Sequence, residues 1–134
     1  MPTFRTFQDI EAWQDARELT RLIYAISNSR AFSSDFGLKR QIREAAVSIM
    51  SNIAEGFERN GRAEFVQFLA IAKGSVGEVI SQTYVALDQG YISEQEFRDL
   101  VKLANQTGRK IGALISYLSR SEIRGSKFKP RDRR

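Results

Sequence analysis

Residues 62–88 read RAEFVQFLAIAKGSVGEVISQTYVALD. Small and apolar side chains recur in this segment at alternating intervals of four and three residues, at Phe65, Leu69, Ala72, Val76, Val79, Thr83 and Ala86. This alternation keeps one face of an α-helix apolar, which suits packing against helices that run nearly parallel or antiparallel to it. The pattern predicts a helix over about residues 62–88 and an all-α fold.

Three further segments carry a helical repeat of apolar residues, and they cover about residues 8–27, 37–58 and 94–120. Ser93 and Glu96 form a capping-box pattern just before the last of them. Turn residues separate the helices at Asn60-Gly61 and Gln89-Gly90, and a polar stretch near residues 28–35 is expected to be a loop anchored by Phe32 and Phe36. Three short connections between four helices predict an antiparallel up-down-up-down bundle over residues 1–121.

The composition removes several classes of function. The chain has 134 residues, enough for one domain, and contains neither histidine nor cysteine. Zinc sites of the usual ligands, Ser-His and Cys-His nucleophile pairs and the Glu-x-x-His motif of di-iron bundles are therefore absent from the sequence. No apolar run approaches the ~20 residues that span a bilayer, and no signal-peptide pattern opens the chain. We expect a cytoplasmic protein with no cofactor, no metal and no membrane contact.

Catalysis has little support in the sequence. Ser75 and Glu78 stand one helical turn apart, but no histidine or oxyanion loop accompanies them. A Mg²⁺-dependent nuclease would need clustered carboxylates, whereas the acidic residues here are scattered. We therefore expect a protein that is not an enzyme.

The net charge of +5 lies entirely in the last fifteen residues. Residues 1–119 contain fourteen basic and fourteen acidic side chains, so the helical body is formally neutral. We expect residues 122–134 to form a flexible basic tail that contacts the phosphates of RNA, the alternative being a solubilising terminus. The tail cations, together with candidates on the helices, make up the predicted nucleic-acid-binding set: Arg59, Arg62, Arg109, Lys110, Arg120, Arg124, Lys127, Lys129, Arg131, Arg133 and Arg134.

Polar residues form a stripe beside the apolar face of the second helix. Gln41, Ser48, Asn52 and Glu55 repeat with helical spacing and end at Arg59. We interpret this stripe as a structural polar seam, in which Asn52 and Glu55 bond to a neighbouring element, because a buried polar group without a partner costs about 1–3 kcal/mol. Ligand or metal binding by Glu55 and simple solvent exposure remain the alternatives.

The third helix carries apolar residues outside its main stripe, at Phe68, Ile71 and Val85. A cluster of exposed apolar residues on one helix is typical of an interface, so we expect these three side chains to mediate self-association. Gly74 and Gly77 would allow another backbone to approach. The alternative is a helix that is packed on several sides within one chain.

Residues 41–56, QIREAAVSIMSNIAEG, resemble the four-helix-bundle family of 23S ribosomal RNA intervening-sequence proteins, and the Asn-x-x-Glu-Gly core of this stretch is fairly specific. The resemblance extends over about residues 4–118. It includes Phe7, Ile10, Trp13 and Ala16 with their three-residue spacing, Glu64-Phe65, the stretch FLAIAKGS at residues 68–75, Glu78, and Gly90-Tyr91-Ile92.

This resemblance implies a bacterial protein of unsettled activity. Family members are similar to the accessory variability protein of diversity-generating retroelements, a basic bundle that assembles as a pentameric ring. The likeness therefore implies a homopentamer that binds nucleic acid or a reverse transcriptase. Because the helical body here is neutral, any basic face must come from local clustering of cations. Our main hypothesis is a self-assembling RNA-binding bundle, and the alternative is a protein-interaction scaffold with no role in binding nucleic acid.

Overall fold

The computed structural model describes residues 4–128, with side chains described for residues 4–120. These residues form helices and turns without a β-strand. In chain order the elements are the 3₁₀ turn η1 (Phe7–Asp9) and the helices α1 (Glu11–Ile26), α2 (Arg30–Ser34), α3 (Phe36–Glu58), α4 (Arg62–Asp88) and α5 (Glu94–Phe128).

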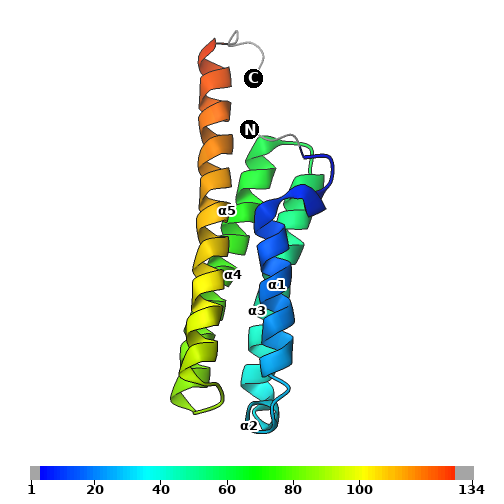
Figure 1. The fold of residues 1–134 in the computed structure, drawn as a ribbon. Coiled ribbons are helices and arrows are strands. Elements are labelled where there is room, and N and C mark those ends of the chain that lie inside the picture. The colour runs from blue at the N-terminus through cyan, green and yellow to red at the C-terminus, as the bar shows by residue number, and fades with distance from the viewer. Residues whose placement is uncertain (1–3, 129–134) are drawn as a thin grey trace.

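The four long helices run antiparallel to one another in chain order (Figure 1). Helix α1 packs against α3, α3 against α4, α4 against α5, and α5 against α1, so the four close into a bundle. The predicted all-α, up-down-up-down arrangement is therefore confirmed. The upper end of α5 projects beyond the other long helices in this view.

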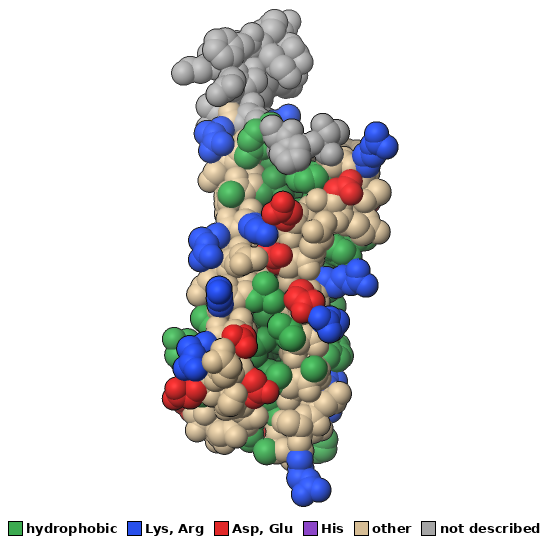
Figure 2. Space-filling model, in the orientation of Figure 1, with side chains coloured by type: hydrophobic (Ala, Val, Ile, Leu, Met, Phe, Trp, Pro, Cys, Tyr) green, Lys and Arg blue, Asp and Glu red, His purple; other side chains and the backbone are tan. Residues whose placement is uncertain are grey.

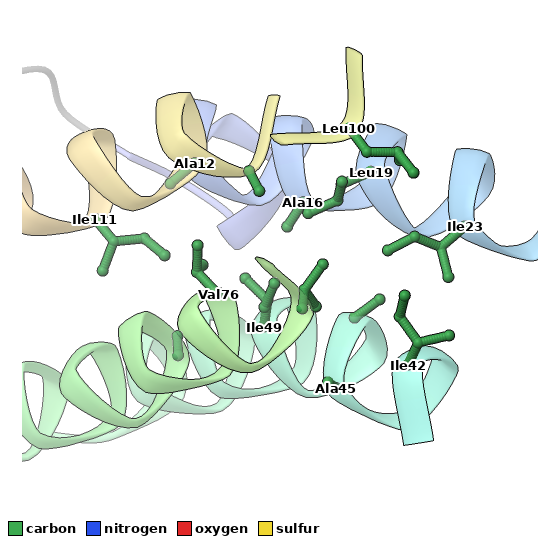
Figure 3. Close-up of a cluster of buried hydrophobic side chains, with 14 of the residues drawn as sticks. Ala12, Ala16, Leu19, Ile23, Ile42, Ala45, Ile49, Val76, Leu100 and Ile111 are labelled. Atoms are coloured by element: carbon green, nitrogen blue, oxygen red, sulfur yellow. The ribbon is translucent and has the colours of Figure 1, made fainter. Parts of the chain in front are cut away.

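The core lies along the axis of the bundle and draws on all four long helices (Figure 3). On α4 the predicted stripe faces inward: Leu69, Ala72, Val76, Val79, Thr83 and Ala86 are buried, and Phe65 is partly buried. Isoleucine and leucine from the other helices meet it, and each fully buried side chain of this size contributes about 1.5–3 kcal/mol. The alternation of four and three residues therefore marks the side of α4 that the other helices cover.

Helices α3 and α4 approach each other closely at Gly56. A Cβ atom placed on this glycine would lie 2.7 Å from Cβ of Phe68 and 3.0 Å from Cδ1 of Phe65, which is shorter than van der Waals contact. The aromatic side chains of α4 thus pack directly on the backbone of α3. This packing gives a physical reason for glycine in the Asn-x-x-Glu-Gly stretch.

Residues in the connections between the helices cap the helix ends. The backbone N–H of Glu96 donates to Ser93 Oγ at 3.0 Å, and that of Ser93 donates to Glu96 Oε1 at 2.8 Å, which confirms the capping box. Gly90 adopts the left-handed conformation (φ +76°) that glycine tolerates best. At the start of α3, Asp35 Oδ1 accepts from the backbone N–H of Leu38 at 3.1 Å.

The connection between the first two long helices differs from the prediction. The stretch expected to be a loop contains the short helix α2, and Phe32 on it is buried and stacks on Tyr91 with ring centroids 5.3 Å apart. Phe36 is not an anchor, since 77% of it is exposed. It is the first residue of α3 and lies on an edge that points away from the core.

The first and last helices also differ in their ends. The first helical segment begins as the 3₁₀ turn η1, and α1 itself starts at Glu11. Helix α5 continues to Phe128, past the expected end near residue 120, because no proline interrupts the chain before Pro130. Residues 122–128 of the expected tail are therefore helical, and residues 129–134 lie outside the described part.

Candidate nucleic-acid interface

The predicted helix-borne cations lie in two separate places. Arg59 and Arg62 flank the turn between α3 and α4, whereas Arg109 and Lys110 lie midway along α5. Gly108 faces Val76, which follows Arg62 by fourteen residues on α4, so Arg109 lies roughly 20 Å from that turn along the bundle axis. The structure does not bring these four cations together.

Carboxylates already compensate two of the predicted cations. The Nζ atom of Lys110 lies 2.9 Å from Asp15 Oδ2 and 3.1 Å from Glu11 Oε1, both from the first turns of α1. The hydrogen bond to Asp15 is the main cause that raises the pKa of Lys110. Arg59 pairs with Glu55 at 2.9 Å. Each of these two cations thus already lies beside a carboxylate of the same chain.

The remaining predicted cations within the described residues lie on α4 and α5. Arg62, Arg109 and Arg120 are exposed and have no ion-pair partner among the side chains of residues 4–120. On the face in Figure 2, Lys and Arg side chains lie along α5, and acidic ones lie at its border with α1. Arg124 and Lys127 belong to the end of α5, where only the backbone is described, and Lys129, Arg131, Arg133 and Arg134 lie outside the described residues.

A second group of cations, absent from the predicted set, lines an open groove of about 770 Å³ between α1 and α3. We call it the α1–α3 groove. Its lining residues are Tyr24 from α1 and Phe36, Lys39, Arg40, Arg43, Glu44, Val47 and Ser48 from α3. The lining of this groove thus contains three cationic side chains and one carboxylate.

Neutral oxygen atoms hold the guanidinium of Arg43 in place. Its Nε donates to Ser27 Oγ at 2.8 Å, and its terminal nitrogen donates to Asn28 Oδ1 at 3.0 Å and to the carbonyl of Tyr24 at 3.3 Å. The same guanidinium lies 4.3 Å from the centre of the Tyr24 ring. These partners fix the position of Arg43 without neutralising its charge.

Lys39 and Arg40 also lack a carboxylate partner among the side chains of residues 4–120. Lys39 Nζ donates to Ser33 Oγ at 3.1 Å, and Arg40 is exposed. None of the three groove cations has an ion-pair partner among the side chains of residues 4–120. The α1–α3 groove is therefore a local concentration of positive charge on a formally neutral body.

Apolar surface accompanies this charge. Phe36 is 77% exposed, Tyr24 41% and Val47 39%. Phe36, Arg40, Arg43 and Val47 follow one another at intervals of four, three and four residues, so they share one edge of α3. This spacing is visible in the sequence, but only the packing of α1 beside α3 shows that the edge borders a groove.

The polar stripe of α3 faces α4, and its Ser48 lies at the border between this stripe and the groove. Ser48 Oγ and Ser75 Oγ are 2.9 Å apart, and the Gln82 amide nitrogen donates to Gln41 Oε1 at 3.4 Å. The Asn52 amide instead donates to the carbonyl and hydroxyl oxygens of Ser48 one turn away on the same helix. Glu55 pairs with Arg59, which directly follows α3, so these bonds of Asn52 and Glu55 do not reach a neighbouring element, contrary to the expectation.

The expected interface residues of α4 differ in exposure. Ile71 is 53% exposed and Val85 42%, whereas Phe68 is partly covered because it packs over Gly56 and beneath Arg59. Glu64 and Glu78 alternate with Ile71 and Val85 at seven-residue intervals, so these four residues lie along one edge of α4. Apart from the adjoining residues and local backbone of α4, no atom of the described chain lies within 4 Å of a Cβ built on Gly74 or Gly77.

The described residues contain neither a candidate metal site nor a membrane-spanning helix. Within them, no group of three or more Asp and Glu side chains is arranged to hold a metal ion. Among the same residues, no helix combines the length and the hydropathy needed to cross a membrane.

These features define an antiparallel four-helix bundle with charged, partly apolar edges. The chain belongs to the 23S rRNA-intervening sequence protein family, whose pattern it matches over residues 8–113. A similar solved structure is a protein of unknown function from the S23 ribosomal protein family of Bacteroides thetaiotaomicron, 19% identical, with a TM-score of 0.72 over 78% of this chain and 95% of that one. At this identity the likeness shows the fold alone. No curated protein matched the chain.

Proposed function

We propose that this protein is a non-enzymatic, self-associating bundle that binds RNA through phosphate contacts. The observation that carries the proposal is the concentration of cations without carboxylate partners at Lys39, Arg40 and Arg43. The surplus of positive charge in residues 120–134 adds to it. Phosphate is the partner that such cations bind in nucleic acids, and the name of the family refers to an insertion in 23S rRNA.

Salt dependence tests the phosphate contacts. If about five phosphates are neutralised per chain, the logarithm of the binding constant falls with the logarithm of salt concentration with a slope of about −3 to −5. Fluorescence anisotropy of a labelled RNA at four salt concentrations measures this slope. A wild-type protein that binds no RNA at low salt contradicts the proposal.

The contribution of the C-terminal cations is tested in the full-length chain. Glutamine in place of Arg124, Lys127, Lys129, Arg131, Arg133 and Arg134 removes six charges and keeps the length of the chain. Each lost phosphate contact should make the slope shallower by about 0.7–0.9. An unchanged slope would remove the C-terminal residues from the binding surface and leave the helices as its source.

Self-association would place several copies of the cations on one RNA and so raise the overall affinity. The exposed apolar side chains of Ile71 and Val85 support an interface on α4. Light scattering should return a mass several times 15.3 kDa, with five copies being the number that the resemblance implies. Ile71→Glu combined with Val85→Glu should reduce this mass, whereas Asn105→Glu with Ser116→Glu, at exposed positions of α5, should not.

The same exposed apolar side chains favour a second candidate function, a scaffold that holds a partner protein such as a reverse transcriptase. In that case a protein would co-purify with the chain from its native host and stay bound after nuclease treatment. The RNA-binding proposal instead expects bound RNA in the same preparation.

A further inference from the structure

We propose that the α1–α3 groove binds a single-stranded segment of RNA, with one base stacked on the exposed ring of Phe36 or Tyr24 and the adjoining phosphates held by Lys39 and Arg40. This inference rests on the proposed function and names its site. It also assigns the binding of unpaired bases to residues outside the set predicted from the sequence.

The exposed ring of Phe36 is the first reason. With 77% of it exposed, Phe36 forgoes most of the stabilisation that burial of an aromatic side chain provides. Tyr24 lines the same groove from α1 and is 41% exposed. Exposed aromatic faces are the surfaces on which proteins stack unpaired bases, and this stacking tolerates any base.

The fixed charge of Arg43 is the second reason. Its guanidinium is positioned by Ser27, Asn28 and the carbonyl of Tyr24, so little conformational freedom is lost when an anion binds beside it. The two other cations of the groove, Lys39 and Arg40, follow Phe36 by three and four residues, about one turn further along α3. A base on the ring would therefore carry its phosphates toward positive charge.

The dimensions of the groove fit this ligand. The groove is open, and its volume of about 770 Å³ leaves room for one or two nucleotides lying along α3. Paired bases are stacked inside a duplex and cannot reach an aromatic ring on a protein surface. An acidic peptide would satisfy the cations, but its carboxylates offer no aromatic face to stack on Phe36. Charge and aromatic surface together favour single-stranded RNA.

The test uses full-length protein and two fluorescent RNAs, an unstructured octamer of uridine and a duplex of equal length. Phe36→Leu keeps an apolar side chain and removes the ring, and Phe36→Tyr restores a ring. We expect Phe36→Leu to weaken binding of the octamer by about 5- to 150-fold, Phe36→Tyr to bind like wild type, and the duplex affinity to change little.

Two further measurements address the cations and the position of the RNA. Arg40→Gln should make the salt slope shallower by about 1, and the control Lys102→Gln on α5 should leave octamer binding within about twofold. Ultraviolet crosslinking of the octamer followed by mass spectrometry should place the crosslink on Phe36 or Tyr24.

The outcomes separate this inference from the proposed function. If wild-type protein binds RNA and Phe36→Leu and Arg40→Gln bind the octamer equally well, the groove is not the site, although the protein still binds RNA. If wild type binds neither RNA, both proposals fail. A lower assembly mass of the Phe36→Leu protein without RNA would assign the groove to contact between subunits. Equal weakening of polyglutamate binding would assign it to an acidic peptide, and either result overturns the inference.

Discussion

The two edges of α3 differ in how far the rest of the bundle covers them. On the α4 side, Gly56 lets Phe68 pack on the backbone, and the hydroxyls of Ser48 and Ser75 meet at 2.9 Å. On the α1 side, Phe36 and Arg40 remain exposed beside an open groove. Small residues and paired polar groups mark the edge that holds the bundle together, and large exposed residues mark the edge available to a partner.

Because one edge is packed and the other is exposed, we expect the two edges to respond differently to substitution. Changes on the α4 edge should lower the free energy of unfolding, since they disturb close packing or paired hydroxyls. Changes on the groove edge should leave folding nearly intact and alter binding. The following predictions test this separation, from the largest expected effect to the smallest.

Gly56→Ala should destabilise the protein by about 1–3 kcal/mol, because the new Cβ would lie 2.7 Å from Cβ of Phe68 and force the two helices apart. Urea denaturation followed by circular dichroism, at one protein concentration, measures the change. Gly74→Ala on α4 is the matched control. Its Cβ meets nothing within 4 Å, so better helix propensity should stabilise the protein by about 0.5–1 kcal/mol. Changes of the same sign in both variants would contradict the close packing at Gly56.

Ser75→Ala should lower the free energy of unfolding by about 1 kcal/mol, because it removes the partner of the Ser48 hydroxyl at a position that is 7% exposed. A double-mutant cycle with Ser48→Ala isolates the bond between the two hydroxyls. We expect a coupling free energy of about 0.5–1.5 kcal/mol between them. A coupling near zero would show that the seam adds nothing beyond the packing around it.

Phe36→Ala and Arg40→Gln should each change the free energy of unfolding by less than about 0.5 kcal/mol, because neither side chain is covered by the rest of the bundle. The same urea titration serves as the measurement. A loss above about 1 kcal/mol in either variant would mean that the groove edge also holds the fold, and the distinction between the edges would fail.

The smallest effect concerns pH at the start of α3. The Tyr91 hydroxyl donates to Asp35 Oδ2 at 3.0 Å, and this hydrogen bond is the main cause that raises the pKa of Tyr91 above 10.0. The neutral phenol is thus favoured in the folded protein. The stability that the bond provides is complete below about pH 10 and is lost as pH rises through the folded-state pKa.

Thermal melts of wild type and Tyr91→Phe between about pH 8 and pH 11 measure this contribution. The phenylalanine variant should melt at a lower temperature than wild type at pH 8, and the difference should shrink above pH 10. No difference at any pH would show that Tyr91 acts through the packing of its ring on Phe32 rather than through its hydrogen bond to Asp35.

The sequence was sufficient to predict the four long helices, their antiparallel order and the buried face of α4. Each of these follows from a repeat within one segment or from the length of a connection. The groove could not be predicted, because it depends on which edge of α3 lies beside α1. The same limit explains Lys110, whose partners Glu11 and Asp15 are more than ninety residues away in the chain.

The exposure of Phe36 was misjudged for a related reason. In the sequence, Phe32 and Phe36 are equivalent apolar residues in a polar stretch. Phe32 turns inward on α2 and meets Tyr91, whereas Asp35 ends that turn and starts α3 with Phe36 facing outward. Asp35, which ends α2 and begins α3, thus separates the buried ring of Phe32 from the exposed ring of Phe36.

The distribution of charge along α3 runs against the dipole of that helix. Lys39, Arg40 and Arg43 lie toward its N-terminus and Glu55 and Glu58 at its C-terminus, with no acidic residue in the first turn and no basic residue in the last. Such a placement is unfavourable by about 0.3–1 kcal/mol at a surface site in a terminal turn, as at Lys39 and Glu58, and the effect falls off further along the helix. Helix α3 would therefore be a poor helix as an isolated peptide, and the bundle tolerates cations at positions where local stability would favour carboxylates.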